Sequence, residues 1–311
     1  MAEETITPSP YANPEIQVNG YPVSIEVAPP GAKIPVLHRI KDAAHYVGPG
    51  EFDILVDFRD TFVRNGMWNS YVPKERQWNA FNLPEGITVL GFIDPDIKEA
   101  TNEMEWIAQR DFYENDKDCE RYYILNKTIF GKISRWSRPR TKSGNLEFIG
   151  LIRAGVVASE MLGISVEEQV LIQTKRLPLI GQSQGDIAIG LTPHNLETLS
   201  RLKEKHWVFA DVAGATLASI IANVRYLIHI GIRPEKVSIW NAVLSHKGGL
   251  FGLQALRELG IDAQIVAGGY SPRLNKDYYL ETDYGSASVG DAGNALDRFL
   301  PEDLRLLAFN K

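Results

Sequence analysis

The chain has 311 residues, of which 44% are hydrophobic and 23% are charged, proportions typical of a globular protein. Its net charge of −6 argues against nucleic-acid binding through bulk charge, and a single cysteine, Cys119, excludes an internal disulfide framework. No apolar run approaches the roughly 20 residues that span a bilayer, and the acidic first residues are unlike a signal peptide, so we expect a cytoplasmic protein without membrane or nucleic-acid partners.

The first 85 residues differ in composition from the rest of the chain. Alternating apolar and polar residues on both sides of Asn19-Gly20 predict a short hairpin within a proline-rich stretch. Residues 51–85 are dense in aromatic side chains, which favours packing on the chain's own domain or on a partner subunit. Nucleobase stacking is the alternative, but few basic residues accompany these rings. We predict an N-terminal extension, residues 1–85, followed by one domain, residues 86–311.

From residue 86 onward, apolar strands and amphipathic helices alternate. The segments expected as strands are 87–93, 147–151, 170–174, 207–211, 237–244 and 263–267. The segments expected as helices are 96–110, 122–136, 155–162, 216–230 and 250–259. This alternation predicts an α/β fold with a parallel sheet covered by helices, in which ligands bind beyond the carboxyl ends of the strands.

Charged and hydroxyl side chains gather at those predicted strand ends. They are Arg153, Lys175, Arg176, Asp211 and the run Ser245-His246-Lys247. Their shared placement predicts a single site. His246 is more simply a loop histidine than a general base, because the six histidines show no metal-ligand spacing and no nucleophile-elbow or Walker-type motif occurs.

The stretch 207–219 is the most informative part of the chain. It predicts a buried strand ending at Asp211, a turn of small residues, and then Thr216 and Ser219 at the start of an apolar helix. A helix N-terminus with short hydroxyl side chains suits an anion, and a neighbouring carboxylate suits the hydroxyls of a phosphorylated sugar. The alternative is that Asp211 only ends a strand and Thr216 only caps a helix.

Four motifs, in order, resemble the uracil phosphoribosyltransferase family, part of the type I phosphoribosyltransferases. Residues 211–219 resemble the family's Asp-Pro-Met-Leu-Ala-Thr-Gly-Gly-Ser, and Ile-Arg-Ala-Gly at 152–155 resembles its Leu-Arg-Ala-Gly. Residues 274–280 resemble Leu-Asn-x-x-Gly-Tyr-Ile, and Gly-Asp-Ala-Gly-Asn at 290–294 resembles Gly-Asp-Ala-Gly-Asp-Arg. The resemblance covers about residues 86–311 and implies a parallel-sheet core of the type I phosphoribosyltransferase kind.

The resemblance also implies an activity, namely transfer from phosphoribosyl pyrophosphate to a uracil-like or other small acceptor in a homodimer, with Mg²⁺ bound to the substrate. By this resemblance Arg153 and Arg176 contact pyrophosphate, and Asp211 meets the ribose hydroxyls. The residues that would hold the 5-phosphate are Ala215, Thr216, Leu217, Ala218 and Ser219. Those that would contact the ribose and the acceptor are Tyr279, Leu280, Gly290 and Asp291.

Two departures from the family pattern leave alternatives open. Leu217 and Ala218 replace the family's two glycines, which places side chains where the backbone should approach a phosphate. The loop after Tyr279 is longer than in the family and lacks its proline, so an acceptor other than uracil fits equally well. The alternatives are a non-catalytic nucleotide sensor of the same fold and an enzyme that uses a different sugar phosphate.

Overall fold

The structure is a computed structural model of the 311-residue chain. It describes residues 16–18, 21–23, 25–26, 37–40, 54–57, 83–108, 115–140, 145–177, 186–190, 198–229, 231–271, 273–274, 280–282, 285–288, 296–302 and 304–305. Within these residues, no helix has the length and apolar character needed to cross a membrane.

Six parallel strands form the core. They are β6 (Ile87–Val89), β7 (Leu146–Leu151), β8 (Gln169–Leu177), β10 (His206–Gly214), β11 (Lys236–Ser245) and β12 (Asp262–Ser271). Their order in the sheet is β8-β7-β10-β11-β12-β6, and each neighbouring pair is parallel. The prediction of an α/β fold with a parallel sheet is therefore confirmed.

Antiparallel strands extend this sheet beyond β8 to ten strands. They are β9 (Asp186–Gly190), β5 (Ile54–Asp57), β4 (Leu37–Ile40) and β3 (Ile25–Glu26). The predicted hairpin is also present, as antiparallel β1 (Ile16–Val18) and β2 (Tyr21–Val23). A small antiparallel sheet follows β12, formed by β13 (Arg273–Leu274), β14 (Leu280–Thr282) and β15 (Gly285–Ser288). The division of the chain at residue 85 stays a prediction.

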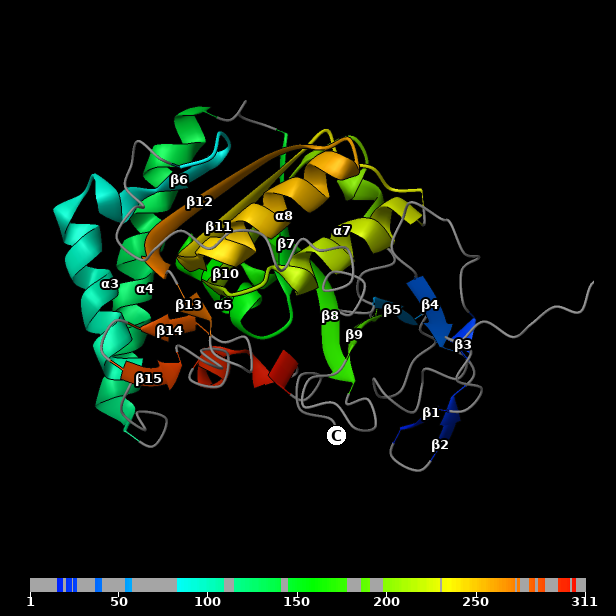
Figure 1. The fold of residues 1–311 in the computed structure, drawn as a ribbon, viewed down its shortest axis with the longest axis horizontal. Coiled ribbons are helices and arrows are strands. Elements are labelled where there is room, and N and C mark those ends of the chain that lie inside the picture. Colours follow the sequence, from blue (N-terminus) through cyan, green and yellow to red (C-terminus); the bar gives the residue numbers. More distant parts are fainter. Residues whose placement is uncertain are drawn as a thin grey trace, which may run out of the picture.

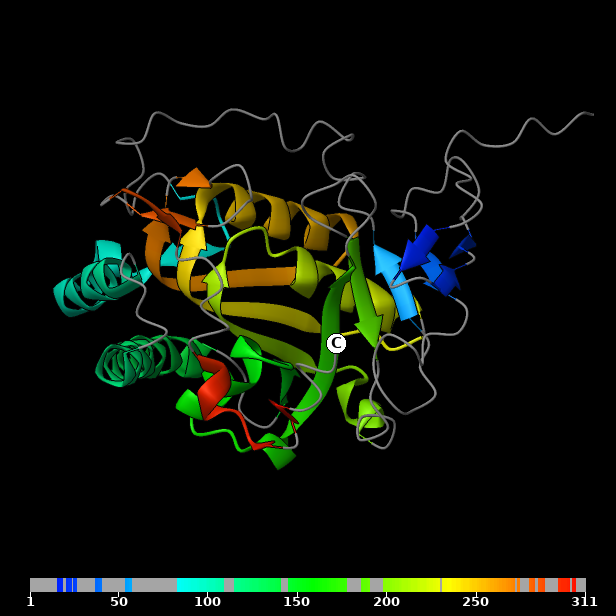
Figure 2. The same cartoon turned by 90° about the horizontal axis from the view of Figure 1, so that it is seen from below.

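Helices cover both faces of the parallel strands (Figure 1). One face packs on α3 (Pro95–Ala108), α4 (Asp116–Ser137) and α5 (Ala154–Met161), and the other on α7 (Ala218–His229) and α8 (His246–Glu258). Figure 2 shows α8 and α4 on opposite sides of the sheet. Along β10, Trp207 and Phe209 join the core on the α7–α8 side, and Val208 joins the core on the other side. Both faces of the strand are buried, which explains its continuous apolar sequence.

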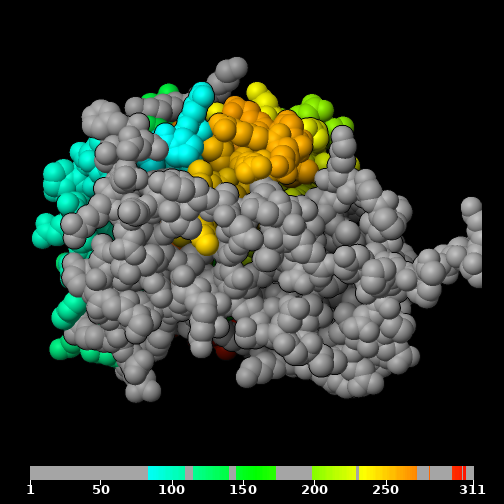
Figure 3. Space-filling model, in the orientation of Figure 1, coloured from blue at the N-terminus to red at the C-terminus, as the bar shows by residue number. Residues whose placement is uncertain are grey.

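Short 3-10 helices connect several of these elements. They are η2 (Leu90–Phe92), η4 (Arg138–Arg140), η5 (Val166–Glu168), η6 (Leu199–Leu202) and η7 (Asp297–Phe299). In Figure 3 the outer surface of α8, in orange, adjoins the cyan surface of the segment around β6 and η2.

Several element boundaries differ from the sequence prediction. β8 ends one residue after Arg176, which therefore lies at the strand end, whereas β10 continues past Asp211 to Gly214, so Asp211 lies inside its strand. The physical reason is pairing, since Arg176 lies opposite Ile187 of β9 and Asp211 opposite Asn241 of β11. A partner strand therefore extends each strand beyond its apolar residues.

Two helices begin earlier than predicted, and side-chain caps explain both starts. Asn115 accepts a hydrogen bond from the Lys117 N–H at 3.1 Å, so α4 begins at Asp116. Ser245 accepts one from the Gly248 N–H at 2.8 Å, so α8 begins at His246. His246 therefore lies in the first turn of a helix and not in a loop.

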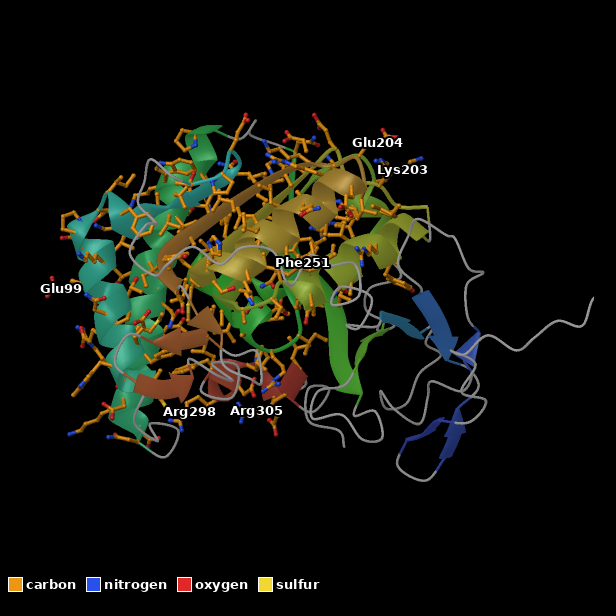
Figure 4. The ribbon with its side chains drawn as sticks, viewed as in Figure 1. Glu99, Lys203, Glu204, Phe251, Arg298 and Arg305 are labelled. Atoms are coloured by element: carbon orange, nitrogen blue, oxygen red, sulfur yellow. The ribbon has the colours of Figure 1, made fainter. Side chains whose placement is uncertain are left out.

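The segment that contains η7 is fixed to the helices on the α3–α5 side. Leu296, Leu300 and Leu304 are all buried in that core. The Arg298 guanidinium lies 2.6 Å from the Asp116 carboxylate at the start of α4. Figure 4 shows Arg298 and Arg305 near the lower end of α4 and beneath the main sheet. This packing gives Asp297, which precedes Arg298, a fixed position.

We predict that His206 makes folding stability depend on pH. The ring is buried at the start of β10 with Nε2 2.8 Å from Ser238 Oγ, and burial, with the nearby Lys236 charge, lowers the pKa of His206 to about 4. Between about pH 4 and about pH 6.5 the unfolded chain binds a proton that the folded chain does not, so stability should rise with pH across this window. The full effect, about 3 kcal/mol, should be present above about pH 6.5.

Urea unfolding at about pH 7 and about pH 5 measures this effect. His206→Gln keeps a hydrogen-bonding side chain but cannot titrate, so its unfolding free energy should change less between the two pH values. Equal changes in the parent protein and the variant would contradict the assignment.

Candidate functional site

The turn between β10 and α7 has an unusual backbone conformation. Thr216 Oγ1 accepts a hydrogen bond from the Ala218 N–H at 3.3 Å, at the first residue of α7. Leu217 has φ of +55°, in the left-handed region that glycine adopts most easily. The position where the resembled family has glycine therefore keeps a conformation that suits glycine, although leucine occupies it.

The side chain of Leu217 points toward α8. It is 5% exposed and belongs to the core on the α7–α8 side. A Cβ atom placed on Gly252 of α8 would lie 2.6 Å from Leu217 Cδ1. Thr216 and Ser219, in contrast, are partly exposed. The Leu217 side chain therefore packs against α8, and the expectation about its effect on a bound phosphate stays a prediction.

Arg153 is the second unusual residue. It lies two residues after the end of β7 and directly before α5, with φ of 117° and ψ of −127°, a region that is essentially restricted to glycine. Its guanidinium Nη2 lies 3.2 Å from the buried carboxylate Oδ2 of Asp297. Non-glycine residues held in such conformations cluster at functional sites, where surrounding contacts maintain them.

Arg153 and the 215–219 turn belong to the same edge of the sheet. β7 pairs with β10 only as far as Phe209, so residues 211–214 of β10 extend beyond the part that pairs with β7. The start of α5 touches β10 closely, because a Cβ atom on Gly155 would lie 3.2 Å from the carbonyl oxygen of Ala210. Asp211, partly exposed, follows Ala210. The structure therefore brings Arg153, Asp211 and the turn to one edge.

The other predicted site residues are placed less fully. Arg176 lies in β8, and only its backbone is described. Leu280 begins β14, and its side chain is fully buried in the core, so contact with a ligand would come from its backbone. Tyr279, Gly290 and Asp291 lie outside the described residues. The assignment of these residues to a ligand site stays a prediction.

Sequence reasoning placed Ser245 at the predicted site but missed its contact with the turn, and it missed Asp297 entirely. Ser245, buried at the end of β11, donates a short hydrogen bond to the carbonyl oxygen of Ala215 in the turn. The sequence feature that indicates a capping role is the position of Ser245 shortly before a predicted helix. Asp297 carried no comparable signal, because 144 positions separate it from Arg153.

Aromatic rings pack beside the turn at the ends of β11 and β12. The ring of His246 is buried and meets that of Tyr270 edge-on, with centroids 6.4 Å apart. Tyr270 also contacts Phe92, with centroids 5.7 Å apart, and burial raises the pKa of Tyr270. These contacts give His246 a packing role in the first turn of α8.

Within the described ranges, no group of three or more histidine, cysteine, aspartate or glutamate side chains could hold a metal ion.

Comparison with known proteins finds similar structures but no matching family model and no matching curated protein. The chain is similar to the AQ2163 protein of Aquifex aeolicus, with a TM-score of 0.44 and 19% identity over 68% of this chain and 97% of that one. It is also similar to the adenine phosphoribosyltransferase of Trypanosoma brucei, solved with AMP, pyrophosphate and ribose-5-phosphate. The TM-score is 0.41 and the identity is 10%, over 66% of this chain and 91% of that one. A third similar structure is the orotate phosphoribosyltransferase of Mycobacterium tuberculosis, solved with 5-phospho-alpha-D-ribosyl 1-diphosphate. Its TM-score is 0.34 and its identity is 11%, over 57% of this chain and 96% of that one.

We predict that Arg153 carries measurable backbone strain. Arg153→Gly and Arg153→Ala both remove the guanidinium and its contact with Asp297, but only glycine adopts φ of 117° without strain. The glycine variant should therefore be more stable than the alanine variant by about 1 kcal/mol, measured as unfolding free energy in urea. An alanine variant of equal or greater stability would show that the backbone relaxes at this position.

Proposed function

We propose that the chain transfers a phosphoribosyl group from phosphoribosyl pyrophosphate to a small acceptor and releases pyrophosphate. The observation that carries the proposal is the β10–α7 turn, where Leu217 directs its side chain away from the partly exposed Thr216 and Ser219. The four sequence motifs shared with the uracil phosphoribosyltransferase family support the same assignment.

The 5-phosphate would bind at the start of α7. The 12-residue helix directs its N-terminal end toward the turn, and the partial positive charge there attracts anions. Thr216 and Ser219 add hydroxyl groups that can donate to phosphate oxygens. The anion site would therefore be built from first-turn amides and two short side chains, with no need for a lysine.

Pyrophosphate would bind at Arg153. A guanidinium presents parallel N–H groups that match two oxygens of a phosphate, and the Arg153 side chain is 33% exposed and thus reachable from solvent. Asp297, itself buried, would hold this guanidinium in place between binding events. Arg176 is the second arginine that the resemblance assigns to pyrophosphate.

The chemistry would depend on positioning and charge. As the bond between ribose C1 and the pyrophosphate oxygen breaks, positive charge develops on the ribose and negative charge on the leaving group. Arg153 would stabilise the leaving group, and Asp211 would accept hydrogen bonds from the ribose hydroxyls. A ring nitrogen of the acceptor then forms the new bond to C1, so the enzyme needs no nucleophile of its own.

Mg²⁺ would arrive bound to the donor. This hard cation prefers oxygen ligands, keeps several waters, and commonly binds through substrate phosphates with few protein ligands. In that role it would neutralise the charge on pyrophosphate, and Arg153 and Arg176 would complete the neutralisation.

Thermal unfolding with added phosphoribosyl pyrophosphate, with and without Mg²⁺, tests the proposal. A donor at 100 times its Kd should stabilise the protein by about 2.7 kcal/mol, or roughly 5 to 10 °C in Tm. Thr216→Val should reduce the shift, whereas Thr128→Val, a matched change on the exposed face of α4, should leave it unchanged. Absence of any shift at millimolar donor would refute donor binding.

Asp211→Asn separates an enzyme from a nucleotide sensor. The variant keeps the shape of the side chain but loses its charge, so pyrophosphate release with candidate acceptors such as uracil should fall to background while donor binding remains. Donor binding in the parent protein without release of pyrophosphate for any acceptor would favour the sensor.

A further inference from the structure

We propose that α8 holds the 215–219 turn in its anion-binding conformation, with Leu217 and Gly252 as positioning residues for the donor phosphate. The inference rests on the proposed function for the identity of the ligand. It concerns the contacts that the turn makes with α8.

The first contact fixes a peptide group. Ser245, 1% exposed, donates to the carbonyl oxygen of Ala215 and accepts from the Gly248 N–H at 2.8 Å. In a trans peptide the carbonyl and the following N–H point in opposite directions. Because the Ala215 carbonyl points to the start of α8, the N–H of Thr216 points away from α8.

The second contact depends on the absence of a side chain. A Cβ atom on Gly248 would clash with the carbonyl oxygen of Ala215 and would lie 2.8 Å from Ser245 Oγ. The first turn of α8 can therefore approach the turn only with glycine at this position. One helical turn later, Gly252 has no side chain, and the Leu217 side chain fills the space that one would occupy.

The third contact keeps Leu217 in the left-handed region. A Cβ atom on Gly252 would lie 2.6 Å from Leu217 Cδ1 and 3.3 Å from Leu217 Cβ. The leucine side chain is buried, and this apolar contact offsets the unfavourable φ of +55°. Figure 4 labels Phe251, the neighbour of Gly252, on the part of α8 that faces α7. The fit between Leu217 and Gly252 thus sets the backbone of the turn.

Gly252→Ala tests this fit, and Gly131→Ala on α4 is its matched control. Both variants place alanine inside a helix, but no atom lies within 4 Å of a Cβ on Gly131. Gly252→Ala should push Leu217 out of place and weaken the affinity for phosphoribosyl pyrophosphate about tenfold by calorimetry. Gly131→Ala should bind the donor as the parent protein does.

The double variant distinguishes positioning from general damage. Leu217→Gly removes the side chain that the new alanine would strike and still adopts a positive φ. Adding it to Gly252→Ala should restore the affinity to within about threefold of Leu217→Gly alone, so the two effects should not add. Additive losses would overturn the inference.

Hydrogen exchange of residues 215–219 in the free protein gives a readout that needs no ligand. Gly252→Ala should raise the exchange rates of these amides about threefold or more, and Gly131→Ala should not. If the parent protein binds no donor, the proposed function fails, and this measurement still tests the role of α8. Unchanged exchange in Gly252→Ala would overturn that role.

Discussion

Burial of the parallel sheet on both faces is the constraint on which the site depends. Helices cover β10 on either side, so its side chains alternate between two apolar cores. A strand of this kind can offer polar groups only beyond the point where its neighbours leave it. The pairing of β10 with β7 stops at Phe209, whereas β10 continues beside β11 to Gly214, and Asp211 and the turn that follows lie partly exposed at this edge. The partly exposed residues of β10, Asp211 and Ala213, therefore lie toward this edge, because the other residues of the strand are buried.

Two strained residues flank that edge, and each is stabilised in its own way. A backbone in such a region costs about 1 to 3 kcal/mol, a large fraction of the 5 to 15 kcal/mol that typically stabilises a domain. Burial of the Leu217 side chain contributes about 1.5 to 3 kcal/mol, which offsets the strain locally. Arg153 has no such burial and depends on an ion pair with Asp297, whose position the η7 packing fixes. One side of the site is thus held by apolar contact and the other by charge.

The sequence predicted the parallel α/β core, because apolar periodicity follows directly from burial on both faces. It placed Arg176 at a strand end, where the structure also has it, but it ended β10 at Asp211, which was wrong, since pairing with β11 and not side-chain polarity decides where that strand stops. It identified the turn at 215–219 but not the direction of Leu217, which depends on a positive φ and on a glycine in a later helix. The Arg153–Asp297 pair could not be predicted, because no local pattern links residues so far apart in the chain.

The replacement of glycine by leucine in the turn shows what the glycine requirement of such turns consists of. A turn of this shape needs a residue with positive φ and free space on the ligand side, and glycine meets both needs at once. Leu217 turns its side chain toward α8, where Gly252 provides the room. The turn and α8 therefore have to be interpreted together, because the position of the Leu217 side chain depends on a glycine in that helix.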